Sequence, residues 1–156
     1  PVMEGKEELL EHSEILLKGL RTLEIPIILT QQYTRGLGMT VKEITDAAGT
    51  EDYQEKISYS AYEELSPLIE GKTYVVVCGI ESHICVLQTV IDLKENGYIP
   101  VLVTDCISSR KHRDKEMALE RARIEGAVLT TYEALLFELL GKAGTPKAKA
   151  IQRLIR

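Results

Sequence analysis

The sequence predicts an α/β fold, a three-layer αβα arrangement in which helices cover a mainly parallel, Rossmann-like sheet. Segments with helical spacing of apolar residues alternate with short apolar runs rich in branched side chains. Such runs suit strands that are buried on both faces of a parallel sheet. A chain of 156 residues is long enough to close one hydrophobic core. We therefore expect a single domain over residues 1–156.

The first half of the chain contains two predicted helices and one predicted strand. Residues 6–23 place leucines and isoleucines at helical spacing. Residues 27–30 are predicted to form a buried strand, and residues 31–38 a loop that leaves its carboxyl end. Residues 60–69 are predicted to form a short helix with Ser60 as its N-cap.

The second half shows the alternation more clearly. The run Tyr-Val-Val-Val-Cys at residues 74–78 is the clearest predicted strand, and Gly79 permits a sharp turn into a helix. Asn96 and Gly97 are typical of the end of that helix. The pattern then continues with a strand, a helix, a strand and two helices, at residues 99–104, 114–125, 127–131, 132–140 and 148–155. Because ligands bind beyond the carboxyl ends of parallel strands, residues 79–85 lie where a site is expected.

Composition and charge exclude several classes of partner. The formal net charge of −5 does not give the basic surface that nucleic acids bind, so we expect no nucleic-acid partner. No run approaches the ~20 apolar residues that span a bilayer. The first residues are acidic, where a signal peptide is basic and then apolar. We therefore expect a cytoplasmic protein without a membrane partner.

The sequence predicts neither a cofactor nor a metal. Gly36 and Gly38 lack the third glycine of a dinucleotide-binding loop, and they do not open a helix in the required way. The three cysteines and three histidines show no familiar zinc-ligand spacing.

Cys85 is the candidate nucleophile. It follows the Gly79 turn, within the first turn or so of a helix that we expect Ser82 to cap. Backbone N–H groups and the helix dipole stabilise a thiolate there and can lower a cysteine pKa from about 8.5 toward neutrality. The same N–H groups are suited to an oxyanion, which favours acyl transfer. From the residues alone, a small side chain packed under the helix is an equally good interpretation.

The other reactive residue types have structural interpretations. We expect Cys78 in the core, and Cys106 packed at a strand end, with lining of the crevice as the alternative for Cys106. His83 lies two residues from Cys85, and residues at this spacing on a helix do not face one another. We therefore expect an exposed or interface histidine rather than a catalytic base. Taken by itself, Lys56 is expected to be a solvated surface residue.

Several segments carry a resemblance to a known family. The clearest, at residues 77–93, reads Val-Cys-Gly-Ile-Glu-Ser-His-Ile-Cys-Val-Leu-Gln-Thr-Val-Ile-Asp-Leu. The other segments lie at residues 30–33, 36–38, 96–101, 104–110, 118–119, 126–131 and 133–139. Over almost the whole chain the sequence resembles the isochorismatase-like cysteine hydrolases, in particular the branch of small isochorismatase-domain proteins.

This resemblance implies a triad of cysteine, lysine and aspartate. Cys85 matches the nucleophile, and Lys56 matches the lysine that shortly precedes a Ser-Ala-aromatic stretch. The backbone N–H groups of Glu81 and Cys85 would form the oxyanion hole, and a cis peptide bond is expected between Ile80 and Glu81.

The resemblance also bears on substrate and assembly. It implies a small-molecule substrate and a homo-oligomer. On the geometry of the predicted fold, Gln32, Tyr33 and Ser60 are expected to line the substrate pocket. The metal-binding aspartate and the paired histidine of nicotinamidases in this superfamily have no match here, so no metal is expected.

The family pattern departs from this sequence at the start. The family begins with a central apolar strand that ends in the catalytic aspartate, and that segment would precede Pro1. We expect the sequence to be truncated there, because the remaining core pattern is intact. The missing strand would leave its neighbours with unpaired backbone groups.

Three functions remain open. The first is a metal-independent cysteine hydrolase that cleaves an amide-type C–N bond of a small molecule through a thioester. The second is a catalytically inactive oligomeric binding or scaffold protein of the same fold, and the third an isochorismatase-type vinyl-ether hydrolase. The third reaction does not need a thiol nucleophile, which favours the first.

Overall fold

The structure is a computed structural model that describes residues 3–156. Its helices and strands alternate as predicted for most of the chain. The elements are α1 (Lys6–Thr22), β1 (Leu29–Gln32), α2 (Thr34–Leu37), α3 (Lys42–Ala48), β2 (Tyr53–Lys56), α4 (Tyr62–Leu65), η1 (Ser66–Leu68), β3 (Tyr74–Ile80), η2 (Ser82–Val86), α5 (Leu87–Glu95), β4 (Ile99–Ser108), α6 (His112–Ile124), β5 (Val128–Thr130), α7 (Tyr132–Leu140) and α8 (Pro146–Ile155).

The strands are parallel and form two sheets. One sheet has the order β1-β2, and the other the order β3-β4-β5. Among residues 3–156, β1 and β3 therefore each pair along one edge only. The predicted α/β class is confirmed, with parallel strands divided between two sheets.

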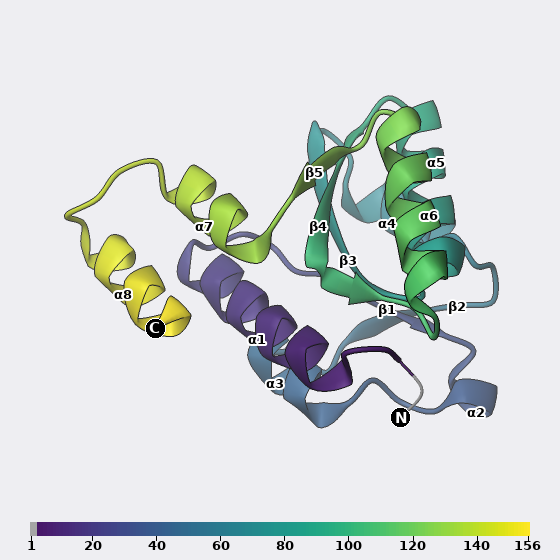
Figure 1. The fold of residues 1–156 in the computed structure, drawn as a ribbon, viewed down its shortest axis with the longest axis horizontal. Coiled ribbons are helices and arrows are strands. Elements are labelled where there is room, and N and C mark those ends of the chain that lie inside the picture. Colours follow the sequence, from purple (N-terminus) through teal and green to yellow (C-terminus); the bar gives the residue numbers. More distant parts are fainter. Residues whose placement is uncertain (1–2) are drawn as a thin grey trace.

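Helices cover both faces of the larger sheet, which gives the three predicted layers. Helices α1, α7 and α8 lie on one side of β4, and α5 and α6 lie on the other (Figure 1). Successive side chains of a strand point to opposite faces, and β4 follows this rule. Leu102 belongs to the cluster of buried residues that includes Val90 and Leu93 of α5. Val101 and Val103 pack instead with α1, α7 and α8.

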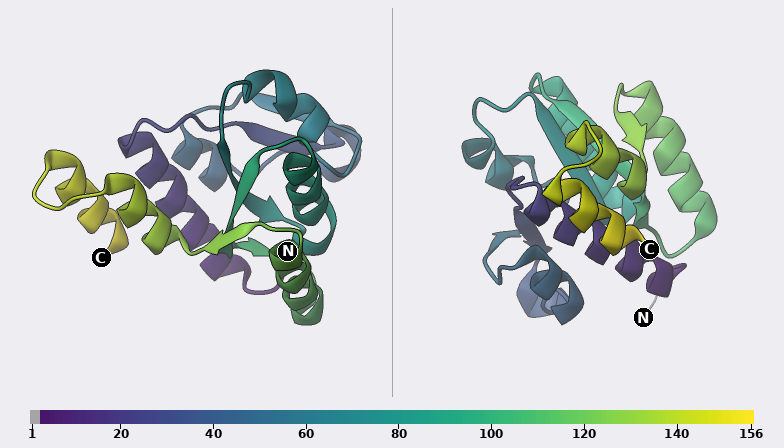
Figure 2. Two further views of the ribbon diagram at one scale, coloured as in Figure 1. Left: turned by 90° about the horizontal axis from the view of Figure 1, so that it is seen from above. Right: turned by 90° about the vertical axis from the view of Figure 1, so that its left-hand side faces the viewer.

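The carboxyl-terminal helices α7 and α8 complete the layer that contains α1. Figure 2 shows α8 beside α1 on the side of the sheet away from α5 and α6. Leu136 of α7 and Ile151 of α8 are fully buried in this layer, against Leu16 of α1. The Thr145 hydroxyl oxygen accepts a hydrogen bond from the Ala148 N–H at 3.0 Å, and this N-cap fixes where α8 begins.

Several element boundaries differ from the predicted ones. Strand β1 begins two residues later than predicted and includes Gln31 and Gln32, which were expected in a loop. Strand β4 continues to Ser108 and takes up Cys106, which is fully buried. Helix α3 and strand β2 were not predicted, because their sequences have no long apolar run.

Candidate active site

The carboxyl ends of three parallel strands meet at the candidate site. Gln32 is the last residue of β1, Lys56 is the last residue of β2, and Cys85 follows the end of β3. Gln32 and Lys56 are register partners in the β1-β2 sheet. The Tyr33 N–H extends this pairing by donating to the Lys56 carbonyl at 2.9 Å. The parallel pairing therefore sets the two side chains next to each other.

Lys56 is a buried residue, with 4% of its surface exposed. Its Nζ donates to Gln32 Oε1 at 2.5 Å, to the Ser58 carbonyl at 2.9 Å and to the Tyr59 carbonyl at 2.6 Å. Three oxygen acceptors match the three N–H donors of an ammonium group, which removes much of the cost of its burial. The expectation of a solvated surface residue was wrong, because the loop after β2 folds back over the side chain.

Cys85 is a partly buried free cysteine whose thiol faces Gln32. Its Sγ lies 3.9 Å from Gln32 Oε1, the same oxygen that accepts from Lys56. The amide nitrogen of Gln32 donates to the Ile57 carbonyl at 2.6 Å, so the amide oxygen is held toward the thiol and the lysine. The structure thus brings three predicted site residues together around one oxygen atom.

The segment that carries Cys85 is a π-helical turn rather than the predicted α-helical turn. The Val86 N–H donates to the carbonyl of Glu81, five residues earlier, at 3.2 Å, and this spacing defines a π-helix. Helix α5 then continues from Leu87. π-Helical turns are rare and often occur at functional sites. The predicted cis peptide bond between Ile80 and Glu81 is confirmed.

Ser82 does not cap the helix as predicted. It lies inside η2, and the N-cap residue Glu81 makes no side-chain capping bond. The Ser82 side chain is buried, and its hydroxyl has no hydrogen-bond partner among residues 3–156.

Thr89 connects the turn that carries Cys85 to the loop that covers Lys56. Its hydroxyl donates to the Cys85 carbonyl at 2.7 Å and accepts from the Ala61 N–H at 2.9 Å. The residue is buried, with 5% of its surface exposed. Sequence reasoning missed Thr89, since a threonine one turn after the nucleophile has the spacing of an ordinary helix residue.

Tyr33 and Ser60 lie near the site without a side-chain hydrogen bond to Cys85 or Lys56 in the described part of the chain. Tyr33 follows Gln32 directly, has a positive φ of 39° and is 47% exposed. The Ser60 hydroxyl accepts from the Tyr62 N–H at 3.2 Å, although α4 begins at Tyr62 with Ala61 as its N-cap. That Tyr33 and Ser60 line a substrate pocket stays a prediction.

The other two cysteines differ from Cys85 in their surroundings. Burial raises the pKa of the Cys78 thiol to about 11. Burial also raises the pKa of the Cys106 thiol far above its ordinary value, and the neighbouring Cys78 and Asp105 add to this effect. Both residues pack in the cluster between the sheet and α1, α7 and α8. The prediction that they are structural is in accord with this packing.

His83 is partly buried rather than exposed, and the alternative that it lies at an interface stays a prediction. Its side chain is 26% exposed. Its Nδ1 lies 2.9 Å from Ser109 Oγ, and its Nε2 lies 3.8 Å from a carboxylate oxygen of Asp114. Within residues 3–156, no group of three or more His, Cys, Asp and Glu side chains is placed to hold a metal ion. No described helix is long and apolar enough to cross a membrane.

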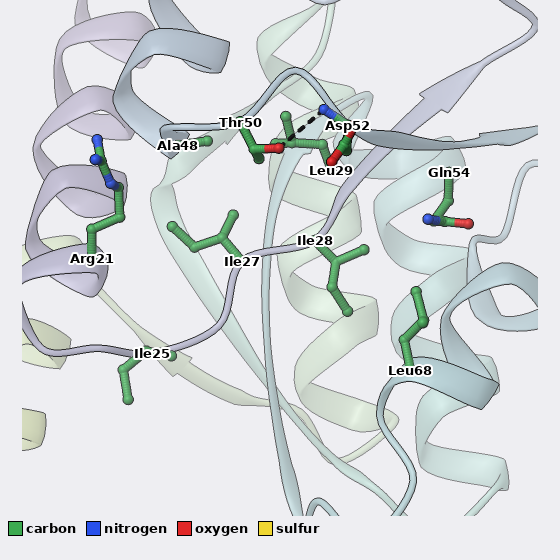
Figure 3. Close-up of a pocket in the computed structure, with 10 residues that line it drawn as sticks. All are labelled: Arg21, Ile25, Ile27, Ile28, Leu29, Ala48, Thr50, Asp52, Gln54 and Leu68. Carbon is green, nitrogen blue, oxygen red and sulfur yellow. Dashed lines mark hydrogen bonds between the residues drawn. The ribbon is translucent and has the colours of Figure 1, made fainter.

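A cavity of about 370 Å³ lies apart from these residues (Figure 3). The cavity lies near the amino-terminal end of β1. Residues from the end of α1, the segment after α3, the start of β2 and η1 surround it. None of the predicted site residues lines it. Its lining residues are Arg21, Ile25, Ile27, Ile28, Leu29, Ala48, Thr50, Asp52, Gln54 and Leu68.

Comparison with known sequences identifies the family. The chain matches the isochorismatase domain over residues 1–134. Isochorismatase domain-containing protein 2 of Xenopus laevis is 38% identical over 147 residues, which cover 90% of this chain and 69% of that protein. A secreted isochorismatase effector of Phytophthora sojae is 36% identical over 150 residues, which cover 90% of this chain and 71% of the effector. The chain therefore belongs to the isochorismatase family.

Solved structures share the fold. The structure of MAR1 ribonuclease from Caenorhabditis elegans matches with a TM-score of 0.92 and 36% sequence identity, over 99% of this chain and 81% of that one. The ycaC gene product of Escherichia coli, described as an octameric hydrolase of unknown specificity, matches with a TM-score of 0.87. It is 19% identical over 99% of this chain and 79% of that chain, so it supports the fold alone.

Proposed function

We propose that the protein is a cysteine hydrolase that cleaves an amide-type C–N bond of a small molecule through a thioester on Cys85. The observation that carries this proposal is the shared contact of Gln32 Oε1 with the Cys85 thiol and the buried Lys56. A nearby positive charge favours a thiolate, which is the nucleophilic form of cysteine. Membership of the isochorismatase family supports hydrolysis as the reaction class.

The proposed reaction has two steps. Sγ of Cys85 attacks the carbonyl carbon, and the N–H groups of Glu81 and Cys85 stabilise the negative oxygen that forms. The thiol proton passes to a base and then to the leaving nitrogen, the C–N bond breaks, and an acyl thioester remains. Water then cleaves the thioester, which releases the acid and restores the thiol. The resemblance implies an aspartate before Pro1 as the base, with Lys56 beside the thiolate.

The test is the capture of an acyl-enzyme in the full-length protein. We expect p-nitrophenyl acetate to acetylate Cys85 with a burst of p-nitrophenolate, and intact mass followed by peptide mapping locates the acetyl group. The Cys85→Ala variant should lose both the burst and the adduct. Cys106→Ala is the matched control and should keep them. Acetylation that is absent, or that is no greater on Cys85 than on lysines, would contradict the proposal.

Two alternative functions give different results in a substrate panel. Turnover of a vinyl ether that persists in Cys85→Ala indicates the isochorismatase-type reaction, since that chemistry needs no thiol nucleophile. A full-length protein that turns over no amide, ester or vinyl ether is consistent with an inactive binding or scaffold protein. RNA belongs in the panel because one structural relative is described as a ribonuclease.

Assembly and location are further parts of the proposal. We expect a homo-oligomer that acts in the cytoplasm on a small molecule, without a nucleic-acid or membrane partner. The octameric relative is in line with self-association of this fold. Three free cysteines suit a reducing compartment. Light scattering of the full-length protein tests the assembly, and cell fractionation tests the location, since one relative is named as secreted.

A further inference from the structure

We propose that the ion pair between Glu81 and Arg110 holds the nucleophile turn in the position at which its N–H groups bind an oxyanion. The inference rests on the proposed function, because it assigns a positioning role at the same site. Neither residue needs to touch the substrate for this role. Arg110 belongs to the loop between β4 and α6, far from Glu81 in the sequence.

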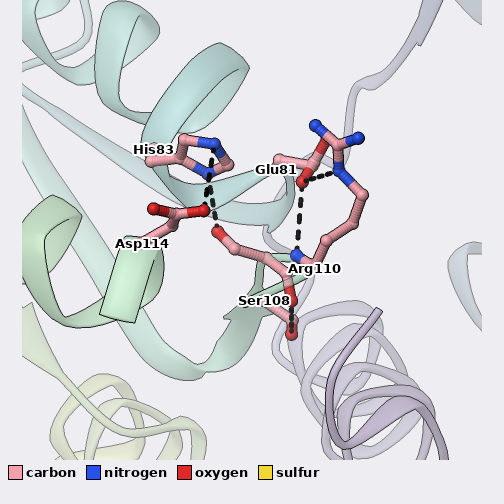
Figure 4. A network of polar contacts seen from close by, with 6 residues as sticks. Glu81, His83, Ser108, Arg110 and Asp114 are labelled. Carbon is pink, nitrogen blue, oxygen red and sulfur yellow. Dashed lines mark hydrogen bonds and ion pairs between the residues drawn. The ribbon is translucent and has the colours of Figure 1, made fainter. Parts of the chain in front are cut away.

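One carboxylate oxygen of Glu81 receives two hydrogen bonds from the same residue. The Arg110 backbone N–H lies 3.3 Å from Glu81 Oε2, and the Arg110 Nε lies 3.0 Å from it (Figure 4). Because one donor is backbone and the other is side chain, the contact fixes the loop as well as the arginine. The Glu81 side chain is only 18% exposed, whereas that of Arg110 is 57% exposed.

The ion pair lies just beyond the point where the pairing of β3 with β4 ends. Strands β3 and β4 are paired up to Ile80 and Ser108, after a register irregularity between Val77 and Gly79. Glu81 and Arg110 are the first and second residues beyond that last pair. The side-chain contact therefore continues the connection between the two strand ends past the last register pair.

A second contact joins the same two segments. Nδ1 of His83 lies 2.9 Å from the hydroxyl of Ser109, whose surface is 1% exposed. The Glu81 carbonyl accepts from the Ile84 and Val86 N–H groups, so the orientation of Glu81 is passed on to the backbone of η2. The turn that presents Cys85 is thus anchored through the side chains of Glu81 and His83 to one loop.

Loss of the ion pair is expected to change the position of the nucleophile turn rather than the stability of the fold. An ion pair with one exposed partner adds little to folding stability. An oxyanion hole, in contrast, depends on donors placed to within about 0.5 Å. Loss of the Glu81 contact should therefore leave the protein folded and slow only those reactions of Cys85 that develop an oxyanion.

Two reactions of the same sulfur separate these effects. Acetylation by p-nitrophenyl acetate passes through a tetrahedral oxyanion, and p-nitrophenolate leaves. Alkylation by iodoacetamide displaces iodide directly and forms no oxyanion. The ratio of the acetylation rate to the alkylation rate at Cys85 therefore reports the oxyanion site, and the alkylation rate reports folding and thiolate content.

The experiment measures this ratio in full-length variants. We expect Arg110→Ala and Glu81→Ala to lower the ratio by about tenfold or more, and Arg110→Lys to restore part of it. Arg121→Ala is the matched control, because it removes an exposed ion pair with Glu125 on α6 and should leave the ratio unchanged. An unchanged ratio in Arg110→Ala and Glu81→Ala, or an equal fall of both rates, overturns the positioning role. Absence of acetylation at Cys85 in the unmodified protein instead overturns the proposed function, and the positioning role with it.

Discussion

The amide of Gln32 joins residues from separate parts of the chain. Its oxygen accepts from Lys56 and faces the Cys85 thiol, and its nitrogen is held by the Ile57 carbonyl. Lys56 has three oxygen acceptors, and within residues 3–156 it forms no ion pair with a carboxylate. In the described site the Lys56 ammonium is therefore held by three neutral oxygen atoms, one of which also faces the Cys85 thiol.

Replacing Lys56 should affect both reactivity and folding. Lys56→Met keeps an unbranched side chain but removes the charge and the three donors. We expect alkylation of Cys85 to slow, because Lys56 holds the Gln32 amide oxygen that faces the thiol. We also expect a loss of roughly 1–3 kcal/mol of stability, because three partly buried hydrogen bonds are lost. Urea unfolding and alkylation rates measure the two effects.

The control for this prediction is an exposed lysine. Lys72→Met removes a lysine that is exposed in the turn before β3 and should change neither quantity. Equal alkylation rates in Lys56→Met and the unmodified protein would show that Lys56 has only a structural role.

The residue scale also shows what the sequence can and cannot predict. Cys85 could be singled out from its place after a strand and Gly79. Lys56 could be singled out only through the family resemblance, since a lysine is usually exposed. The bridging role of Gln32 depends on the register of β1 with β2. That register could not be predicted while β2 itself was unrecognised.

At the scale of elements, the site depends on how α5 is joined to the loop over Lys56. The connection is the Thr89 hydroxyl, which bonds the Cys85 carbonyl and the Ala61 N–H. Ala61 immediately precedes α4, so the start of α4 and the turn that carries Cys85 share one buried hydrogen-bonding group.

Removing this hydroxyl should loosen the two elements together. Thr89→Val keeps the size and branching of the side chain but leaves the buried Ala61 N–H without its acceptor. We expect a loss of about 1–3 kcal/mol of stability and slower acetylation of Cys85. Thr89→Ser retains the hydroxyl and should acetylate at nearly the original rate. If Val and Ser at this position behave alike, the hydroxyl is not the connection.

Element prediction succeeded where apolar runs are long and failed where they are short. The strands at β3 and β4 and helices α1, α6 and α7 were recognisable from hydrophobic spacing. Strand β2 reads Tyr-Gln-Glu-Lys and has no such pattern, because tertiary pairing with β1 decides its conformation. The π-helical turn before α5 was predicted as α-helical, because its apolar spacing continues that of the helix.

At the scale of the whole molecule, two further cysteines pack in the layer that α1, α7 and α8 form with the sheet. Cys106 is fully buried, and Cys78 packs against the same cluster. Their raised pKa values mean that the folded state binds thiol protons more tightly than the unfolded chain.

Stability should therefore fall at high pH. The contribution of Cys78 is fully present below the ordinary pKa of a cysteine in the unfolded chain and is lost as the pH rises through about 11. By pH 11 the loss is about 2 kcal/mol for this residue. Urea unfolding across this range should show a shallower fall for Cys78→Ala than for the unmodified protein. Parallel curves for the two proteins would contradict the assigned protonation.

The fold-level prediction held because it depends on the alternation of elements rather than on their exact ends. Helices on both faces of β4 follow from the apolar pattern of that strand. The division into two sheets was not predicted as such, although unpaired neighbours of a missing family strand were expected.

The relative reactivity of the three cysteines is the sharpest test of Cys85 as the nucleophile. The full-length protein is treated near neutral pH with limiting iodoacetamide, and each cysteine peptide is quantified by mass spectrometry. We predict that Cys85 is alkylated at least about tenfold faster than Cys78 and Cys106, because burial keeps those two thiols protonated. Alkylation of Cys85 at the same rate as the other two, or more slowly, would contradict its role as the nucleophile.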